Sequence, residues 1–298
     1  MKILFIIIIA LKVINAATSD SITEERQTPA RAAFIPLEEF GIESNELGKK
    51  IYLMYVQLNR IAAFWVPQTG MTVDGSALWK SGVFTTTGKR IMQVPTLYRT
   101  EVGTNSEAVK EFLRKPSTID CVAAVFIVAA NIIAQKASRE LNCVSNFGTI
   151  YSPTIMPFLQ RSQNHFPKEI GEFGPFTNIE TYARIHDPKT DRDSAENVFC
   201  IGRRNGEPMY MGFGKLFEDG PKTRQQILDS LFRGFQNVYA RFISDRPNLQ
   251  AALRLPSVIT REDWDEKQEE AQNKPLLILL LSEQTISAGS HAITQMIK

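Results

Sequence analysis

The sequence is poor in the residues that most often bind metal ions, with three cysteines and three histidines among 298 residues. The cysteines at 121, 143 and 200 are 22 and 57 residues apart, and the histidines at 165, 186 and 291 do not complete a zinc-binding spacing. An acidic loop of the EF-hand type is also absent from the sequence, which gives no support for calcium dependence. We therefore expect no metal and no cofactor.

The sequence has no strong excess of charge of either sign. Its formal net charge is +2, and 22% of its residues are charged. Without a run of basic residues, these values give no electrostatic argument for a nucleic-acid partner.

Long apolar runs are missing too, and the short run at the start is typical of a secretory signal peptide. Residues 1–17 combine a basic start, a short apolar stretch and small residues at Ala16 and Ala17, where we expect cleavage. Lys12 interrupts the run, and Leu276–Leu281 is much shorter than the roughly 20 residues that a membrane helix needs. The sequence thus predicts a secreted or extracytoplasmic protein without a stable membrane span.

Export makes disulfide bonds possible, and the odd number of cysteines leaves at least one thiol free. Cys143 and Cys200 are the natural candidates for a bridge, although sequence alone does not establish the pairing. The remaining thiol is then Cys121.

With 43% apolar residues, the sequence has enough material for one large globular domain. After the signal peptide we expect a flexible N-terminal arm over 18–46, a folded domain over 47–260 and a C-terminal extension over 261–298. Helical spacing of apolar residues predicts amphipathic helices over 47–65 and 223–242. Further expectations are short strands within 76–94, a short helix over 106–113, a long irregular binding loop or lid over 136–180, a charged, solvated helix or linker over 262–274 and a strand or amphipathic closing element at 276–281.

The central feature of the sequence is the stretch that follows Asp120. From Val122 to Ala134 it is apolar on every side except at Asn131, which predicts a helix buried in the middle of the domain. Asp120 is a suitable N-cap residue, so Cys121 becomes the first residue of this helix. A helix N-terminus favours negative charge and converts a thiol to a reactive thiolate. A cysteine next to an apolar helix can equally be a simple packing residue.

A second group of candidate residues lies in a predicted β-hairpin. Two short apolar strands flank Asn205-Gly206, a dipeptide typical of a two-residue hairpin turn. Glu196 begins the first strand, where a solvated strand end is the simplest interpretation. Tyr210 and Trp79 are aromatic residues that either line a substrate entrance or belong to the core.

Several motifs, in this order, resemble the spore-coat transglutaminases, a family of bacterial protein-glutamine gamma-glutamyltransferases. The family has an acidic residue directly before a catalytic cysteine at the start of a buried helix, as in Asp120-Cys121. Its second motif is Glu-Asn-Val followed by an aromatic-rich return strand ending in Gly-x-Gly, as in Glu196-Asn197-Val198 and Gly212-Phe213-Gly214. The resemblance covers roughly residues 40–260.

The resemblance implies an α+β fold with a papain-like core, in which the helix that starts at the cysteine packs on a small antiparallel sheet. It assigns Cys121 as the nucleophile, Glu196 as the general base and Asp120 as an auxiliary acid or base. Two positions depart from the family pattern. Asp120 replaces a longer glutamate, and Met211 occupies the position of a histidine in the return strand.

The function implied is formation of isopeptide bonds between glutamine carboxamides and primary amines through a thioester on the cysteine. The partners are protein substrates that carry glutamine and lysine. The alternatives are a glutamine deamidase, a cysteine peptidase on the same fold, or a secreted binding protein without catalytic activity.

Overall fold

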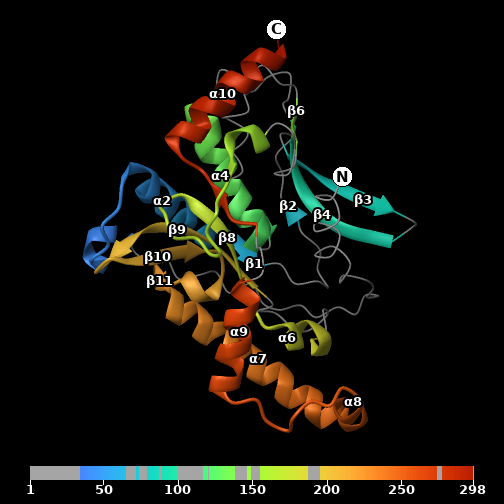
Figure 1. The fold of residues 1–298 in the computed structure, drawn as a ribbon. Helices are drawn as coiled ribbons and strands as arrows, with labels where there is room; N and C mark the ends of the chain where they lie inside the picture. The colour runs from blue at the N-terminus through green and yellow to red at the C-terminus, as the bar shows by residue number, and fades with distance from the viewer. Residues whose placement is uncertain are drawn as a thin grey trace.

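The computed structural model describes residues 34–64, 72–73, 79–86, 89–98, 117–119, 121–137, 146–148, 155–186, 195–273 and 277–297 (Figure 1). The predicted signal peptide, the predicted helix over 106–113, Asp120 and Cys143 lie outside these residues.

The protein has an α+β fold whose main sheet is antiparallel and six-stranded, in the order β11-β10-β9-β8-β12-β7. Residues 198–202 of the central strand β9 are all buried, so both faces of the sheet are covered. An α+β fold with a small antiparallel sheet agrees with the expectation from the sequence. The strands are β7 (Gln160–Arg161), β8 (Glu172–Thr177), β9 (Ala195–Arg204), β10 (Glu207–Gly212), β11 (Lys222–Thr223) and β12 (Leu279–Leu280).

Helices cover the two faces of this sheet in pairs (Figure 1). One face carries α2 (Glu46–Ile61) and α4 (Cys121–Lys136), and the other carries α7 (Arg224–Asp245) and α9 (Arg261–Asn273). On the first face the ring of Phe126 in α4 meets Phe173 of β8 edge-on, with ring centroids 6.2 Å apart. The side chains that point from β9 toward α4 are therefore separated by the sheet from those that point toward α7.

The predicted central helix is confirmed as α4, which begins at Cys121. Every residue from Ala124 to Ala134 is buried, as expected for a helix that is apolar on all sides. The one polar side chain in this stretch, Asn131, accepts a hydrogen bond from Gln135 Nε2 through its Oδ1 at 2.9 Å. A buried amide that keeps a partner in this way avoids most of its desolvation cost.

Helix α2 confirms the amphipathic helix predicted over 47–65 as far as Ile61, whereas residues 62–64 form a strand, and the helix approaches the sheet closely. A Cβ atom at Gly48 would lie 2.1 Å from the carbonyl oxygen of Ile201 in β9. Only glycine fits at this contact, so Gly48 allows α2 to lie directly against the central strand.

The predicted hairpin and the second amphipathic helix are also confirmed. Asn205 and Gly206 connect β9 to β10 with φ angles of 53° and 82°, which are the left-handed angles of a two-residue hairpin turn. Helix α7 begins with a capping box, in which Thr223 and Gln226 exchange side-chain to backbone hydrogen bonds.

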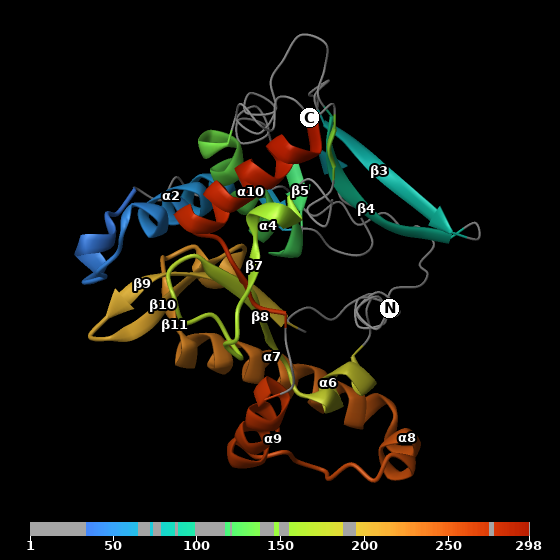
Figure 2. The ribbon, with the colours of Figure 1, turned by 45° about the horizontal axis from the view of Figure 1, so that its top comes forward.

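Two small sheets and several short helices complete the described part of the chain (Figure 2). The strands predicted within 76–94 are confirmed by the β3–β4 hairpin. The two sheets contain β1 (Ala62–Phe64), β5 (Ser117–Ile119) and β2 (Thr72–Val73), and β3 (Trp79–Thr86), β4 (Lys89–Tyr98) and β6 (Asn146–Gly148). The short helices are η1 (Leu37–Phe40), η2 (Met156–Phe158), α6 (Glu180–Ile185), η3 (Lys215–Phe217) and α8 (Pro247–Ala252).

The C-terminal segment is an integral part of the fold and not an appended extension. Strand β12 inserts into the main sheet between β8 and β7, and α10 (Glu283–Ile297) packs on η2. Trp264 of α9 is fully buried, and its Nε1 donates a hydrogen bond to Asn178 Oδ1 at 3.1 Å. The expected boundary after residue 260 therefore does not separate structural units.

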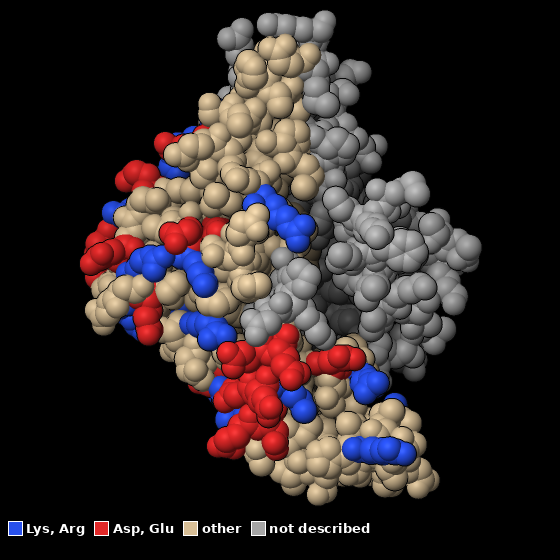
Figure 3. All heavy atoms as spheres, in the orientation of Figure 1, with Lys and Arg blue, Asp and Glu red and all other residues tan. Residues whose placement is uncertain are grey.

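The outer face of α9 is strongly acidic, as Figure 3 shows. The charged helix expected over 262–274 is thus present, although its inner face carries the buried side chains of Trp264 and Gln268. The acidic side chains that it exposes are Glu262, Asp263, Asp265, Glu266, Glu269 and Glu270.

The described part of the expected N-terminal arm is packed against the domain. Leu37 and Ile42 are buried. Glu43 and Arg203 exchange two backbone hydrogen bonds of 2.8 Å, which tie residues 42–44 to the end of β9. Flexibility expected from the polar composition of 18–46 does not extend to these residues, because their apolar side chains are buried.

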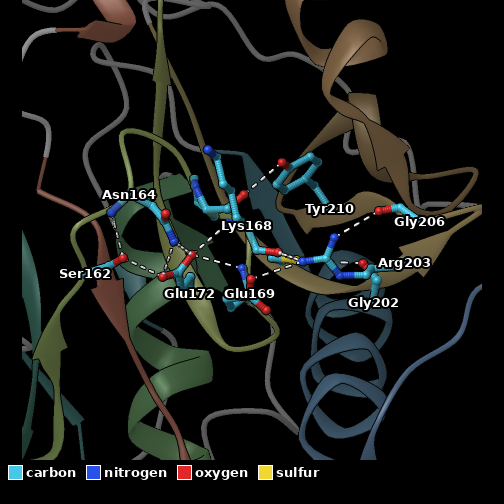
Figure 4. Close-up of polar contacts among 11 residues, drawn as sticks. Ser162, Asn164, Lys168, Glu169, Glu172, Gly202, Arg203, Gly206 and Tyr210 are labelled. Atoms are coloured by element: carbon cyan, nitrogen blue, oxygen red, sulfur yellow. Dashed lines mark hydrogen bonds and ion pairs between the residues drawn. The ribbon is translucent and has the colours of Figure 1, made fainter.

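A buried carboxylate organises the loop between β7 and β8 (Figure 4). Glu172, with 3% of its surface exposed, accepts hydrogen bonds from the Ser162 hydroxyl, the Asn164 amide at 2.8 Å and the backbone amides of Lys168 and Glu169 at 2.7 and 2.9 Å. Burial alone would raise the pKa of Glu172, but these hydrogen bonds outweigh it and the pKa is lowered.

The other side of this loop is fixed to the sheet. Tyr210 Oη donates to the carbonyl oxygen of Pro167 at 2.8 Å, and Arg203 donates to the carbonyl oxygen of Lys168 at 3.1 Å (Figure 4). The segment 136–180, expected to be a binding loop or lid, thus contains a central strand of the sheet, and residues 162–171 are anchored from both sides.

Cys200 is a free thiol, which corrects the suggestion that it pairs with Cys143. It is fully buried in β9, where burial raises its pKa to about 12. A thiol with this pKa stays protonated at neutral pH and is a poor nucleophile. Cys200 is therefore a packing residue.

The Glu172 network predicts a pH-dependent loss of stability. Replacing Glu172 with Gln puts an amide donor where two backbone amides already donate, and we expect the free energy of unfolding at pH 7 to fall by about 2–4 kcal/mol. Because the pKa of Glu172 is lower in the folded state, its contribution is present above the unfolded value near 4.5 and is lost as the pH falls through the folded value.

Urea denaturation at pH 7 and at pH 3 measures the difference in free energy of unfolding between the wild-type protein and Glu172→Gln. This difference should be smaller at pH 3. Glu169→Gln is the matched control, since Glu169 forms an exposed ion pair with Arg203 that contributes about 0–1 kcal/mol. Equal losses in the two variants at pH 7 would contradict the role given to Glu172.

Candidate active site

The candidate nucleophile lies at a turn between a strand and a helix. Strand β5 ends at Ile119 and α4 begins at Cys121, so one residue separates the two elements. Cys121 is half-buried and free of any disulfide. The positive end of the helix dipole at the start of α4 favours the thiolate form of such a cysteine.

The sulfur atom of Cys121 lies against the first residues of β9. Asn197 Nδ2 donates a hydrogen bond to Sγ at 3.2 Å, and the carbonyl oxygen of Ala195 lies 4.0 Å from Sγ, where it accepts from the thiol. An amide that donates to sulfur stabilises the thiolate more than the thiol, because the hydrogen bond to a charged acceptor is stronger. Asn197 and the helix N-terminus therefore act in the same direction.

Alternation along β9 decides which side chains face the thiol. Asn197 and Phe199 point toward the face covered by α2 and α4, where Phe199 packs on Phe173 with ring centroids 4.5 Å apart. Glu196 has the opposite parity and borders a groove together with residues of α7. The sequence singled out Glu196, and its neighbour Asn197 contributes a side chain that contacts the sulfur.

Asn197 was visible in the sequence as the middle residue of the Glu-Asn-Val motif. Knowing which face of β9 packs against α4 would have identified it, since side chains alternate strictly along a strand. The sequence alone does not say which helix covers which face.

The groove next to Glu196 has a volume of about 910 Å³ and runs along α7 and the turn after β10. Its charged groups are partly paired: Lys222 forms an ion pair with Asp219, and Arg261 Nη1 lies 2.7 Å from Asp229 Oδ1. Burial would raise the pKa of Asp229, but its hydrogen bonds with Arg261 and Gln225 lower it. Asp229 is therefore ionised at neutral pH.

Ala195 connects the groove to the thiol. It is one of the residues that line the groove, and its carbonyl oxygen is the acceptor close to Cys121 Sγ. A polar molecule in the groove thus lies against the same strand end that contacts the candidate nucleophile.

The Gly-x-Gly motif after β10 is held in place by Asn59 of α2. Asn59 Nδ2 donates to the carbonyl oxygen of Gly212 at 3.1 Å, and its Oδ1 accepts from the amide of Gly214 at 3.0 Å. Gly214 has a φ of 110°, which side chains other than hydrogen rarely adopt. This clamp fixes the turn that forms one wall of the groove.

Two other residues singled out in the sequence lie in the core. Met211, at the position of the family histidine, is buried opposite Phe199 in the β9–β10 ladder. Tyr210 is fully buried, with its hydroxyl bonded to Pro167, so it is a core residue and does not line an entrance. The side chain of Trp79 and all of Asp120 lie outside the described residues.

The three histidines lie on other elements. His165 belongs to the anchored loop, His291 is exposed on α10, and His186 follows α6 and stacks on Tyr182 at a centroid distance of 5.3 Å. Within the described ranges, histidine, cysteine and acidic side chains do not gather in groups of three that could hold a metal ion. In the same part of the chain, no helix combines the length and apolar character needed to cross a bilayer.

Comparison with known proteins gives no relative from which a function could be transferred. No family model matches the chain, and neither the curated proteins nor the solved structures contain a match.

Proposed function

We propose that this protein is a secreted transglutaminase of the spore-coat type, with a papain-like core and Cys121 as its nucleophile. The observation that carries the proposal is the placement of a half-buried free thiol on the first residue of the buried helix α4, with the Asn197 amide 3.2 Å from the sulfur. The N-terminus of α4 and the Asn197 amide both favour a thiolate, which is the reactive form of cysteine.

The proposed reaction proceeds in two acyl-transfer steps. In the first step the sulfur of Cys121 bonds to the carbonyl carbon of a glutamine carboxamide, the C–N bond breaks, and the nitrogen leaves as ammonia with the thiol proton. In the second step a lysine amine attacks the thioester, gives up a proton and forms an isopeptide bond. The thiol is regenerated. In both steps the backbone amides at the start of α4 are the proposed donors to the oxyanion.

Glu196 is the proposed general base, and Asp120 the auxiliary acid or base. Glu196 lies next to Asn197 on β9 and borders the groove, from which an amine could approach the strand end at Ala195. A carboxylate there can take the proton that the attacking amine loses. In this proposal Asn197 stabilises the thiolate of Cys121, and Glu196 accepts the proton of the attacking amine.

The exposed face of α9 favours a positively charged protein partner. Arg261 at the start of α9 lines the groove, and the exposed face of the same helix is the acidic surface of Figure 3. An acidic surface raises the local concentration of lysine-bearing partners, most strongly at low salt. Protein substrates that carry both glutamine and lysine are the proposed partners.

Incorporation of a fluorescent primary amine into a glutamine-rich protein tests the proposal. The wild-type protein should label its substrate, and Cys121→Ala should abolish labelling because the thioester cannot form. Cys200→Ala is the matched control, since Cys200 is buried and protonated, and this variant should keep most of its activity if it folds.

Other results of the same assay identify the alternatives. Ammonia release without amine incorporation indicates a glutamine deamidase, and peptide-bond cleavage indicates a cysteine peptidase. The absence of all three reactions, together with an unreactive Cys121, would overturn the proposal in favour of a binding protein.

The roles of Glu196 and Asn197 predict different kinetic effects. Glu196→Gln removes the base and should lower kcat by about 10²- to 10⁴-fold, with normal alkylation of the thiol. Asn197→Ala should slow alkylation of Cys121 itself by about tenfold, because one hydrogen bond to the thiolate is lost. Steady-state kinetics combined with iodoacetamide alkylation separates the two, and full activity of Glu196→Gln would contradict its role as the base.

A further inference from the structure

The hydroxyl group of Tyr55 is an unusual feature of the face that α2 presents to β9 and α4. Tyr55 is fully buried on α2, and its Oη has no hydrogen-bond partner among the described residues. A buried hydroxyl without a partner costs free energy relative to its hydration in water. Phenylalanine would fill the same space without that cost, so the hydroxyl calls for a function.

Tyr55 and the thiol share the same side of the sheet. The ring of Tyr55 packs edge-on against Phe199 of β9, with centroids 6.2 Å apart. Asn197, two residues before Phe199 and on the same face of the strand, donates to Cys121 Sγ. Helix α2, which carries Tyr55, also packs directly on α4, which Cys121 begins.

The electrostatics of the pair agree with this geometry. Burial raises the pKa of Tyr55 well above its usual value, and a negative charge on Cys121 raises it further. The phenol therefore stays protonated at every pH at which the protein is expected to work. It is available only as a donor toward a negatively charged neighbour.

We propose that the Tyr55 hydroxyl is a second hydrogen-bond donor to the Cys121 thiolate, in addition to the Asn197 amide. Asn197 acts on the sulfur from β9 and Tyr55 from α2, so residues of two different elements set the acidity of the thiol. While Cys121 is a neutral thiol, the Tyr55 hydroxyl has no partner among the described residues. It gains a hydrogen bond when the thiolate forms.

This inference takes from the proposed function only that Cys121 reacts as a thiolate. It applies equally to a transglutaminase, a deamidase or a peptidase. Glu196 on β9 and Asp120, which directly precedes the cysteine, are the other titratable groups next to this site in the sequence, and both are kept in every variant of the test.

The test is the rate of iodoacetamide alkylation of Cys121 between pH 5 and pH 10 in Tyr55→Phe, with the Cys121 peptide quantified by mass spectrometry. Alkylation displaces iodide from the reagent and forms a carbon–sulfur bond, so its rate follows the thiolate fraction. Loss of the donor should raise the pKa of the thiol by about one unit and slow alkylation near pH 7 by about tenfold.

Tyr210→Phe is the matched control, because Tyr210 is equally buried but its hydroxyl donates to the carbonyl oxygen of Pro167. This variant should lower the melting temperature and leave the thiol pKa unchanged. Tyr55→Phe should show the reverse, with an unchanged or higher melting temperature.

An unchanged thiol pKa in Tyr55→Phe would overturn the inference, and so would an equal shift in both tyrosine variants. Unfolding of Tyr55→Phe would overturn it as well, since it would show that the hydroxyl serves the fold. If no amine incorporation is found but the thiol pKa shifts in Tyr55→Phe alone, the proposed function fails and this inference stands.

Discussion

The burial of α4 is the constraint on which the described structure depends. A helix that is apolar on every side has no face to turn toward water, so other elements must surround it. Helix α2 and the face of the sheet around β9 and β10 do this. The start of the helix is less buried than its middle, since Cys121 and Val122 are only half-buried. The cysteine of this helix therefore lies in the part of it that is accessible.

Strand β9 lies between the helices on the two faces of the sheet and contributes side chains to both faces. Its side chains alternate between the face of α2 and α4 and the face of α7, so adjacent residues contribute to different environments. Asn197 lies against the thiol and Glu196 borders the groove, although the two are neighbours in the sequence. Two neighbouring residues of one strand therefore face two different sites, the Cys121 thiol and the groove.

Local patterns predicted the helices and the hairpin well. The apolar run after Asp120, the amphipathic spacing before residue 62 and the Asn-Gly turn each determine an element through their own residues. The sequence failed where structure depends on distant partners. Strand β8 contains Gly174 and Pro175 and shows no alternation, and it is held in the sheet by β9 and β12. Likewise, the contact between Asn197 and Cys121 joins residues 76 positions apart.

The insertion of β12 between β8 and β7 has a consequence for how the protein folds. Strand β8 pairs on one side with β9, which follows soon after it, and on the other with a strand that is made only after the hairpin, α7 and α9. During synthesis this second edge of β8 remains unpaired, and an unpaired edge is a site where chains associate with one another. Folding of the sheet to its native order is therefore a late event, and premature termination before residue 279 would produce a chain prone to aggregation.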